Sequence, residues 1–590
     1  MSLEIIASIQ AITRAIAVTA ISGLLLAGCI EDEAGIASAP QPAAAASTSK
    51  PADAWAEFQS EFIERSFRLD PTFGASQGRH EYDGELPDWT EQGLRRAIAY
   101  MRTSVDAAEK FRDLTPQQNF DRIYLLTVAR RNLFWLGIAD QPHTNPAFYM
   151  GSLSPSMYIA RPYAPIETRL RAYIKYLGAV PTAANQIRIN LKAPLPLPFV
   201  DYGKASFGGL ATYYLGDGKK AFAEVSDKKL QSELVSASDA AAKAMTDLAN
   251  WIEGQRAKAK NNFALGAVRF AQMVRDTEMV DVPLKKLEAI GRSDLLQNQK
   301  ALKAACASFA PGAPIMSCVE RAGQNKPKGG AVAGARAQLT GLRKFIIEND
   351  LVTVPGTEEA QVEEAPPFAR QNFAYIDIPG PYEKNLPSVY YIAPPDPAWP
   401  AAVQASFVPG EGELTFVSVH EVWPGHFLNF LHANRSKNQF GRVFVGYAFA
   451  EGWAHYTEEM MWDAGLGNGD AVIHIGELSN ALRRDCRYLS AILMHTGRMT
   501  MEQSRRMFVQ QCYQDEGNAR QQAARGTYDP AYLNYTLGKL MIRKLREDWT
   551  AKRGGRKAWK EFHDKFLSYG GPPIPLVRSQ MMGGKPQARF

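Results

Sequence analysis

Two histidines and a glutamate lie close together in the stretch SVHEVWPGHFLNF: His420, Glu421 and His426. A regular helix turns about 100° per residue, so six steps place the second histidine about 240° around the axis from the first. Pro424 has no N–H, and Gly425 permits unusual dihedral angles. We therefore expect the helix to break between the histidines, so that both reach one metal ion. The alternative is a helix that simply ends here, with two unrelated histidines.

A second group of polar side chains lies in AFAEGWAHYTEEM, where Glu451, His455 and Glu458 are four and three residues apart. This spacing puts all three on one face of a helix. Such a face is usually solvated, with incidental charge pairing. Here Phe449 and Trp453 flank it, so we expect a largely buried helix, in which carboxylates are costly unless they are paired or bind a metal.

Together the two stretches contain the groups that zinc hydrolysis requires. A catalytic zinc site has three protein ligands, an open position for water and a base beside that water. We expect His420, His426 and Glu451 to bind Zn²⁺, and Glu421 to act as the general base.

Two tyrosines and two arginines downstream are candidates for substrate contacts. Tyr528 and Tyr535 could donate a hydrogen bond to a developing oxyanion, or they could pack in the core. Arg484 and Arg487 could bind a substrate carboxylate, or they could form salt bridges with Glu458 or the next glutamate. The sequence leaves both choices open.

The motif HEVWPGH resembles the His-Glu-x-x-Pro-Gly-His signature of a bacterial family called domain of unknown function 885, which is grouped with zincin-like metallopeptidases. AEGWAHYTEE resembles its Glu-Gly-Trp-Ala-x-Tyr motif and the glutamate-ligand helix of the aminopeptidase gluzincins. The resemblance is specific over about residues 345–580 and diffuse over 55–345. Further matching positions are Arg484, Arg487, His495, Tyr528, Pro530, Tyr535 and Gly538. The resemblance implies a zincin-like fold, peptidase activity and a catalytic role for His495, although the acid of the family's Asp-x-Gly-x-His pattern is Ala491 here.

The N-terminus has the pattern of a bacterial lipoprotein. An apolar run over residues 15–28 is too short to span a bilayer and ends in LAGC, which resembles a lipobox. We expect residues 1–28 to be a signal peptide, Cys29 to be lipidated, and the Ala/Ser/Pro-rich residues 29–52 to be a tether. Ile30 after the cysteine favours the outer membrane of a Gram-negative bacterium, facing the periplasm. The alternative is an ordinary secretory signal.

The composition fits a globular protein without a nucleic-acid surface. The 590 residues are 46% hydrophobic and 22% charged, and the formal net charge of +6 is spread along the chain without a long Lys/Arg run. The expected partners are therefore a peptide substrate and, through the anchor, a membrane, but not nucleic acid.

Four cysteines follow Cys29. Cys306 and Cys318 could close a short loop as a disulfide in an oxidising compartment. Cys486 and Cys512 lie in helical patterns, and we expect them to be buried thiols.

The pattern of apolar residues predicts a mostly α fold with a small sheet just ahead of the active-site helix. Residues 53–345 are expected to form a helical region, apart from a Pro/Gly-rich connection over residues 193–214. This region would form the walls of the active-site cleft. A few short strands are expected over 351–400, within a zincin-like catalytic region at 346–590.

These observations predict an exported zinc metallopeptidase that cleaves short peptides. Glu421 would take a proton from the zinc-bound water and return it to the leaving amine. One alternative is a metal-dependent amidase acting on non-peptide substrates. Another is a non-catalytic periplasmic binding lipoprotein, but a purely structural metal site needs no base beside it.

Overall fold

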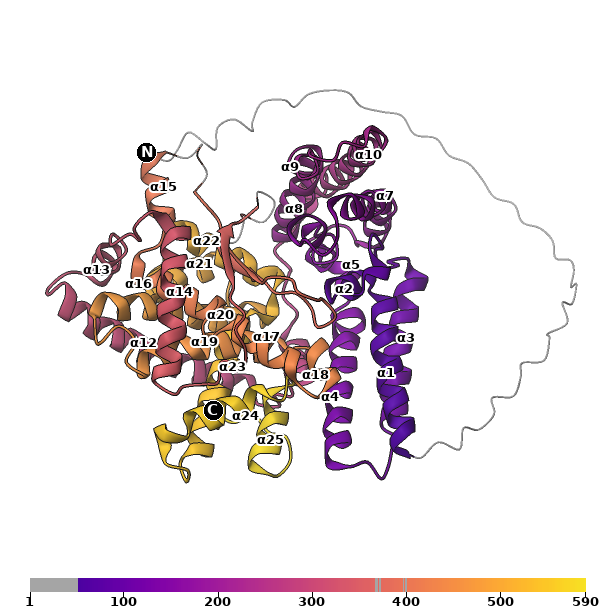
Figure 1. Cartoon of the computed structure of the whole chain (residues 1–590). Helices are drawn as coiled ribbons and strands as arrows, with labels where there is room; N and C mark the ends of the chain where they lie inside the picture. Colours follow the sequence, from indigo (N-terminus) through magenta and orange to yellow (C-terminus); the bar gives the residue numbers. More distant parts are fainter. Residues whose placement is uncertain (1–50, 367–369, 371–372, 396, 398–399) are drawn as a thin grey trace, which may run out of the picture. The chain divides into compact units, whose positions relative to one another are not determined.

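The computed structural model describes residues 51–590 except 367–369, 371–372, 396 and 398–399 (Figure 1). Cys29, the predicted signal peptide and nearly all of the predicted tether lie outside the described residues. The first helix begins at Pro51, so the last two residues assigned to the tether are already helical.

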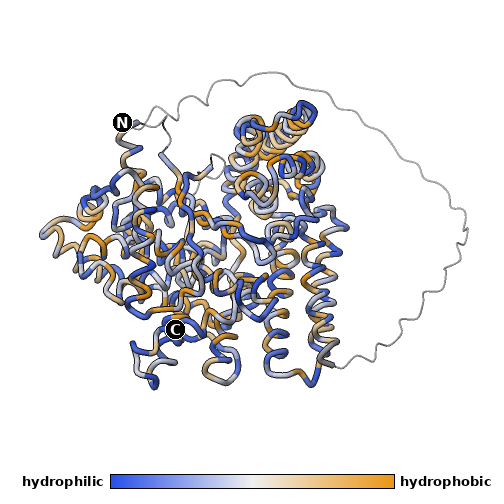
Figure 2. The backbone as a smooth tube through the Cα atoms, viewed as in Figure 1, coloured by the Kyte–Doolittle hydropathy of each residue, from blue (hydrophilic) through white to orange (hydrophobic). Residues whose placement is uncertain are grey.

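The described chain is mostly helical, as predicted. The helices of the first part are α1 Pro51–Leu69, α2 Pro71–Ser76, α3 Glu91–Ala108, α4 Pro116–Leu133, α5 Gln141–Thr144, α6 Ser156–Ala160, α7 Ile166–Asn190, α8 Leu197–Leu215, α9 Asp217–Lys220, α10 Lys228–Glu253, α11 Ala267–Glu278, α12 Leu284–Phe309, α13 Ile315–Ala322 and α14 Gly330–Glu348. After the strands come α15 Ala401–Phe407, α16 Glu411–Glu421, α17 His426–Arg435, α18 Gln439–Val443, α19 Tyr447–Asp463, α20 Ala471–His495, α21 Met501–Cys512, α22 Glu516–Tyr528, α23 Asn534–Thr550, α24 Trp559–Leu567 and α25 Ile574–Met582. Hydrophobic and hydrophilic segments alternate along many of them (Figure 2), as amphipathic helices require.

The predicted connection over residues 193–214 is wrong, because most of it forms α8. Pro198 stands in the first turn of this helix, where a missing N–H leaves no hydrogen bond unmade. Gly203 lies where a Cβ would come within 2.9 Å of Ile252 in α10. The glycine therefore permits close helix packing and does not mark a loop.

Three short strands precede α16, as expected. They are β1 Gln361–Glu364, β2 Ala374–Asp377 and β3 Val389–Ile392. Their order is β1-β3-β2, with β3 parallel to β1 and antiparallel to β2. All four residues of β3 are buried, so this central strand is the core of the sheet.

The core beneath the histidines draws on both predicted regions of the chain. Helix α12 packs along α20, α14 packs against α16, and α19 packs along α23. Gly452 and Gly538 let the last pair come very close, since a Cβ on Gly452 would lie 2.4 Å from the Cα of Gly538.

The four cysteines form two disulfides. Cys306 pairs with Cys318, which was one of the possibilities, and Cys486 pairs with Cys512. Cys486 and Cys512 are buried, as predicted, but the prediction that they are thiols is wrong, because α20 and α21 pack against each other and bring the two cysteines together.

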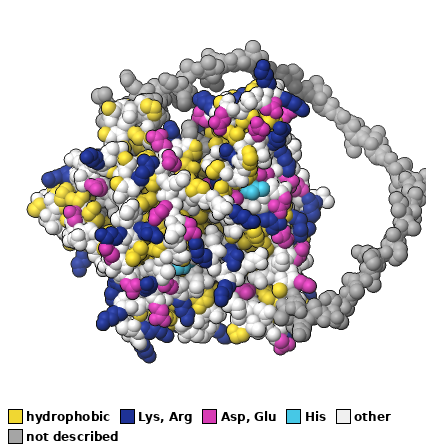
Figure 3. All heavy atoms as spheres, viewed as in Figure 1, with side chains coloured by type: hydrophobic (Ala, Val, Ile, Leu, Met, Phe, Trp, Pro, Cys, Tyr) yellow, Lys and Arg dark blue, Asp and Glu magenta, His cyan; other side chains and the backbone are white. Residues whose placement is uncertain are grey.

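The surface shows mixed charge. On the face drawn in Figure 3, Lys and Arg side chains are interspersed with Asp and Glu. Within the described part of the chain, no helix is long and apolar enough to cross a membrane.

Candidate metal centre

The chain breaks its helix between the two histidines, as predicted. Helix α16 ends at Glu421 and α17 begins at His426. Gly425 donates its N–H to the carbonyl of Val419 at 2.9 Å, and a Cβ on this glycine would lie only 1.8 Å from the carbonyl oxygen of His420. Trp453 of α19 donates its indole N–H to the carbonyl of Pro424 at 2.8 Å. The connection is therefore tied to the helix that carries the glutamate.

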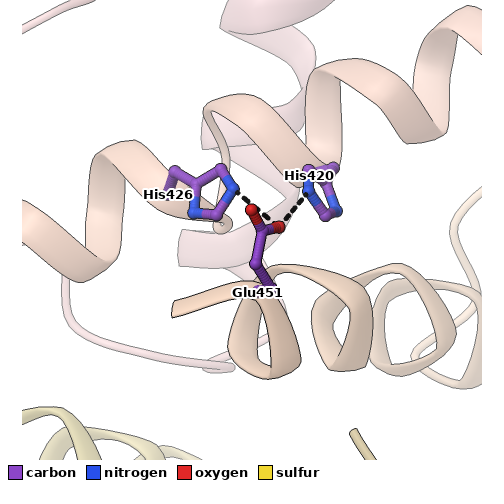
Figure 4. A group of neighbouring side chains, drawn as sticks. All are labelled: His420, His426 and Glu451. Atoms are coloured by element: carbon purple, nitrogen blue, oxygen red, sulfur yellow. Dashed lines mark hydrogen bonds and ion pairs between the residues drawn. The ribbon is translucent and has the colours of Figure 1, made fainter. Parts of the chain in front are cut away.

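His420, His426 and Glu451 converge from α16, α17 and α19 (Figure 4). The Nε2 atoms of His420 and His426 lie 3.2 and 3.3 Å from the same carboxylate oxygen of Glu451. One potential ligand atom from each residue lies within 4.8 Å of the other two. Three ligands at zinc distances of 2.0–2.2 Å in a tetrahedron would be about 3.4 Å apart. The two nitrogen–oxygen separations match this value, and all three atoms lie close enough together to bind one ion after small side-chain shifts.

One side of this group remains accessible. The His420 side chain is 6% exposed, whereas the side chains of His426 and Glu451 are 13% and 21% exposed. Burial opposes the charge on Glu451, but the two imidazoles hold the pKa of its carboxyl well below the usual range. The glutamate is therefore an anion, as a metal ligand must be.

A second carboxylate binds the Nδ1 atom of His420, the ring nitrogen that does not face Glu451. The Nδ1 of His420 donates to Glu458 Oε1 at 2.7 Å, and Arg484 donates to Glu458 Oε2 at 2.8 Å. Arg484 thus forms a salt bridge, one of its two predicted alternatives. Burial opposes the charge on Glu458, but Arg484 and His420 lower the pKa of its carboxyl. Sequence reasoning missed this role, although Glu458 follows Glu451 by seven residues and so lies on the same helical face.

Glu421 is the acid next to the ligands that is free to react. Among the described residues, no side chain forms a hydrogen bond or ion pair with its carboxylate. Burial raises the pKa of Glu421, with partial opposition from His420 and His426. A carboxylate in this environment accepts a proton more readily than an exposed one.

Tyr535 of α23 lies near His420. It is 7% exposed, and its ring centroid is 6.2 Å from the ring of His420. Three guanidinium groups surround the ring: their central carbons lie 5.8 Å (Arg484), 4.9 Å (Arg487) and 5.9 Å (Arg525) from its centroid. Burial and the Glu451 carboxylate raise the pKa of Tyr535, so its hydroxyl keeps the proton it would donate.

Comparison with known proteins identifies the family of this chain. The family described as bacterial proteins of unknown function, DUF885, matches residues 71–581. The chain belongs to this family. No curated protein matches it. Two solved structures share the DUF885 chain's fold: a candidate lipoprotein of unknown function from Shewanella oneidensis (23% identity, TM-score 0.74) and a candidate lipoprotein from Colwellia psychrerythraea (17% identity, TM-score 0.74). Each alignment covers 90% of this chain and 99% of the other.

Two of the predicted site residues of this DUF885 chain lie apart from the ligands. His495 donates from Nε2 to the carbonyl of Gly526 at 2.7 Å and accepts at Nδ1 from the N–H of Leu265 at 3.4 Å, so both ring nitrogens are engaged. Tyr528 packs against Tyr202, with ring centroids 4.1 Å apart and ring planes tilted by 40°. Both line a separate cavity of about 240 Å³. The structure brings Tyr535 to the ligands, but not these two.

A wider cavity of about 1050 Å³ also lies away from the ligands, beside α12, α19 and α23. Its wall includes Asp294, Glu459 and Arg543. These charges neutralise one another and the buried Lys539, whose ammonium lies 2.7 Å from Asp294 and 3.3 Å from Glu459. Size alone would favour this cavity, but Asp294 and Glu459 in its wall are bound to Lys539 and Arg543, whereas no side chain of the described residues forms an ion pair with Glu421.

Proposed function

We propose that this protein is a zinc-dependent metallopeptidase that cleaves short peptides. The observation that carries the proposal is the convergence of His420, His426 and Glu451, whose imidazole Nε2 atoms both lie 3.2–3.3 Å from one Glu451 oxygen. Glu421 lies next to them, and no side chain of the described residues pairs with its carboxylate. An orienting carboxylate behind His420 is a further feature of zinc sites, where it fixes the tautomer of the ligand.

Zinc bound by these three residues would polarise a water molecule and a substrate carbonyl. Glu421 accepts the proton of the attacking water and then donates it to the leaving amine. Tyr535, whose ring lies 6.2 Å from that of His420, would donate its O–H to the oxyanion that develops on the carbonyl. Glu458, held by Arg484, keeps the Nε2 lone pair of His420 directed at the ligand site.

The limited exposure of the ligands favours short peptides over folded proteins. The three ligand side chains are between 6% and 21% exposed, so only a small part of each is accessible to a substrate. An extended peptide can reach this part, whereas the surface of a folded protein cannot.

We also propose that the protein is anchored in the cell envelope through a lipid on Cys29. The LAGC sequence supports this, and the two solved relatives are themselves described as candidate lipoproteins. Two disulfides suit an oxidising compartment. Mass spectrometry of the mature N-terminus tests the anchor: an unmodified Cys29 would contradict it.

The decisive experiment compares zinc content with peptide cleavage. The purified protein should contain one zinc per chain and cleave a mixed peptide library until a chelator removes the metal. Glu421→Gln should keep the zinc and lose at least about 10²–10⁴-fold in rate, because the general base is gone. Glu411→Gln, an exposed change at the start of the same helix, is the matched control and should cleave normally.

Two outcomes would contradict the proposal. Full activity in Glu421→Gln would place the base elsewhere. Zinc binding without cleavage of any peptide, in a protein that binds a ligand equally well with and without Glu421, would favour a binding lipoprotein.

A further inference from the structure

The three arginines around Tyr535 differ in what neutralises their charge. Arg484 pairs with Glu458 at 2.8 Å, and Arg525 pairs with Asp529 at 3.0 Å. Arg487 instead donates its Nε–H to the neutral amide oxygen of Gln522 at 2.7 Å. In the described part of the chain, no carboxylate forms an ion pair with Arg487.

An unpaired guanidinium is costly in this position. Arg487 is only partly exposed and lies beside two other cations, so neither water nor its neighbours fully offset its charge. Burial and the adjacent Arg525 lower its pKa to about 10. It therefore stays charged at neutral pH. A planar guanidinium in this situation suits a carboxylate ligand, which it can bind through two parallel hydrogen bonds.

Arg487 is also within reach of the reacting centre. The Tyr535 ring lies 4.9 Å from the Arg487 guanidinium carbon and 6.2 Å from the ring of the zinc ligand His420. An extended peptide advances about 3.3–3.6 Å per residue. One to three residues therefore span the distance between the metal ligands and the guanidinium.

We propose that Arg487 binds the C-terminal carboxylate of the substrate, so that the enzyme releases a fragment of one to three residues from the C-terminus of a peptide. This inference rests on the proposed peptidase function. In the step itself, water supplies OH to the new carboxyl group and H to the released amine as the C–N bond breaks.

The test uses pairs of short peptides with identical sequence, one ending in a free carboxylate and the other in an amide. Wild-type protein should cleave the acid about 10–100-fold more efficiently in kcat/KM, because a charge-assisted hydrogen-bonded pair is lost with the amide. Arg487→Gln should cleave acid and amide equally, and Arg487→Lys should recover part of the preference. Product masses should show fragments lost from the C-terminus.

The matched control is Arg483→Gln, four residues before Arg487 on α20. Arg483 pairs with Glu413 at 2.7 Å and has no contact with Tyr535 among the described residues. This variant removes the same charge from the same helix and should keep the full preference for the free carboxylate.

Peptide binding to zinc-loaded Glu421→Gln, measured by calorimetry, gives a readout without turnover. The acid should bind about 10–100-fold more tightly than the amide, and the added change Arg487→Gln should abolish the difference.

The outcomes separate the two proposals. Zinc-dependent cleavage that ignores the C-terminal group, or occurs at internal bonds of long peptides, would overturn the carboxylate subsite and leave the peptidase intact. If no peptide is cleaved, the peptidase fails and calorimetry decides the subsite: equal binding of acid and amide overturns it, and acid preference that depends on Arg487 supports it.

Discussion

The imidazole of His420 has a carboxylate at each of its nitrogens. Glu451 lies 3.2 Å from Nε2 and Glu458 lies 2.7 Å from Nδ1. The first would share the metal with the histidine, and the second orients the ring. Because Arg484 holds Glu458 in turn, the position of one ligand depends on a chain of charged side chains that extends away from the metal.

Removing the charge of Glu458 should weaken zinc binding. Glu458→Gln leaves His420 without its anionic partner, and we expect the dissociation constant for zinc to rise about 10–100-fold. Glu459→Gln is the control, because that neighbouring acid pairs with Arg543 and Lys539 and does not contact the ligands. It should lower stability but leave the zinc affinity unchanged. A competition titration with a chromophoric chelator measures both, and wild-type affinity in Glu458→Gln would contradict the orienting role.

Zinc affinity should rise with pH up to about pH 9. Burial and Arg484 oppose protonation of His420, but Glu451 and Glu458 raise its pKa above the ordinary value, to about 9, in the metal-free protein. This proton stabilises the metal-free fold at low pH, and the contribution is lost as the pH rises through 9. Zinc must displace the proton, so the dissociation constant should fall about tenfold per pH unit below 9. The same titration at several pH values checks this slope, and a flat profile would contradict it.

At the residue scale, the sequence predicts which residues form the candidate ligand group, but not the residues that position them. Spacing and residue type are enough to place His420, His426 and Glu451 together. They do not distinguish Tyr535, which the fold brings to His420, from Tyr528, which it carries to another cavity. That difference depends on the packing of α23 along α19, which no local pattern encodes.

The break between α16 and α17 depends on one small residue. Gly425 is the position where the returning chain crosses the carbonyl of His420, at a separation that leaves no room for a side chain. Pro424 and Gly425 made the break predictable. By contrast, the prolines and glycines of α8 led us to predict a loop where a helix forms. Proline is also common in the first turn of a helix, and glycine also occurs where two helices pack closely.

Gly425→Ala should therefore destroy the metal site. A Cβ at 1.8 Å from the His420 oxygen forces the two helices apart, and we expect loss of zinc together with a fall of at least about 1–3 kcal/mol in the free energy of unfolding. Gly341→Ala is the control, since that exposed position in α14 has no atom within 4 Å of a new Cβ. It should gain about 0.5–1 kcal/mol. Metal analysis and urea unfolding give both quantities, and a zinc-replete Gly425→Ala would refute the account.

The two disulfides contribute to the stability of the whole molecule. Cys486 and Cys512 are 26 residues apart, and Cys306 and Cys318 are 12 apart. Loop-closure entropy predicts about 3.5 kcal/mol for the longer loop and about 2.8 kcal/mol for the shorter one. Paired substitution of each to alanine, followed by urea unfolding, should reproduce this order. Equal stability with and without Cys486–Cys512 would show that the bond does not form in solution.

Because a Glu451 oxygen already lies between two imidazole nitrogens, the ligand groups lose little conformational entropy when an ion arrives. Small zinc domains fold only when metal binds, whereas here a core of helices arranges the ligands in advance. Zinc can then bind after the chain has folded. A chelator should leave the far-ultraviolet circular dichroism unchanged while it removes the activity, and added zinc should restore that activity without a refolding step.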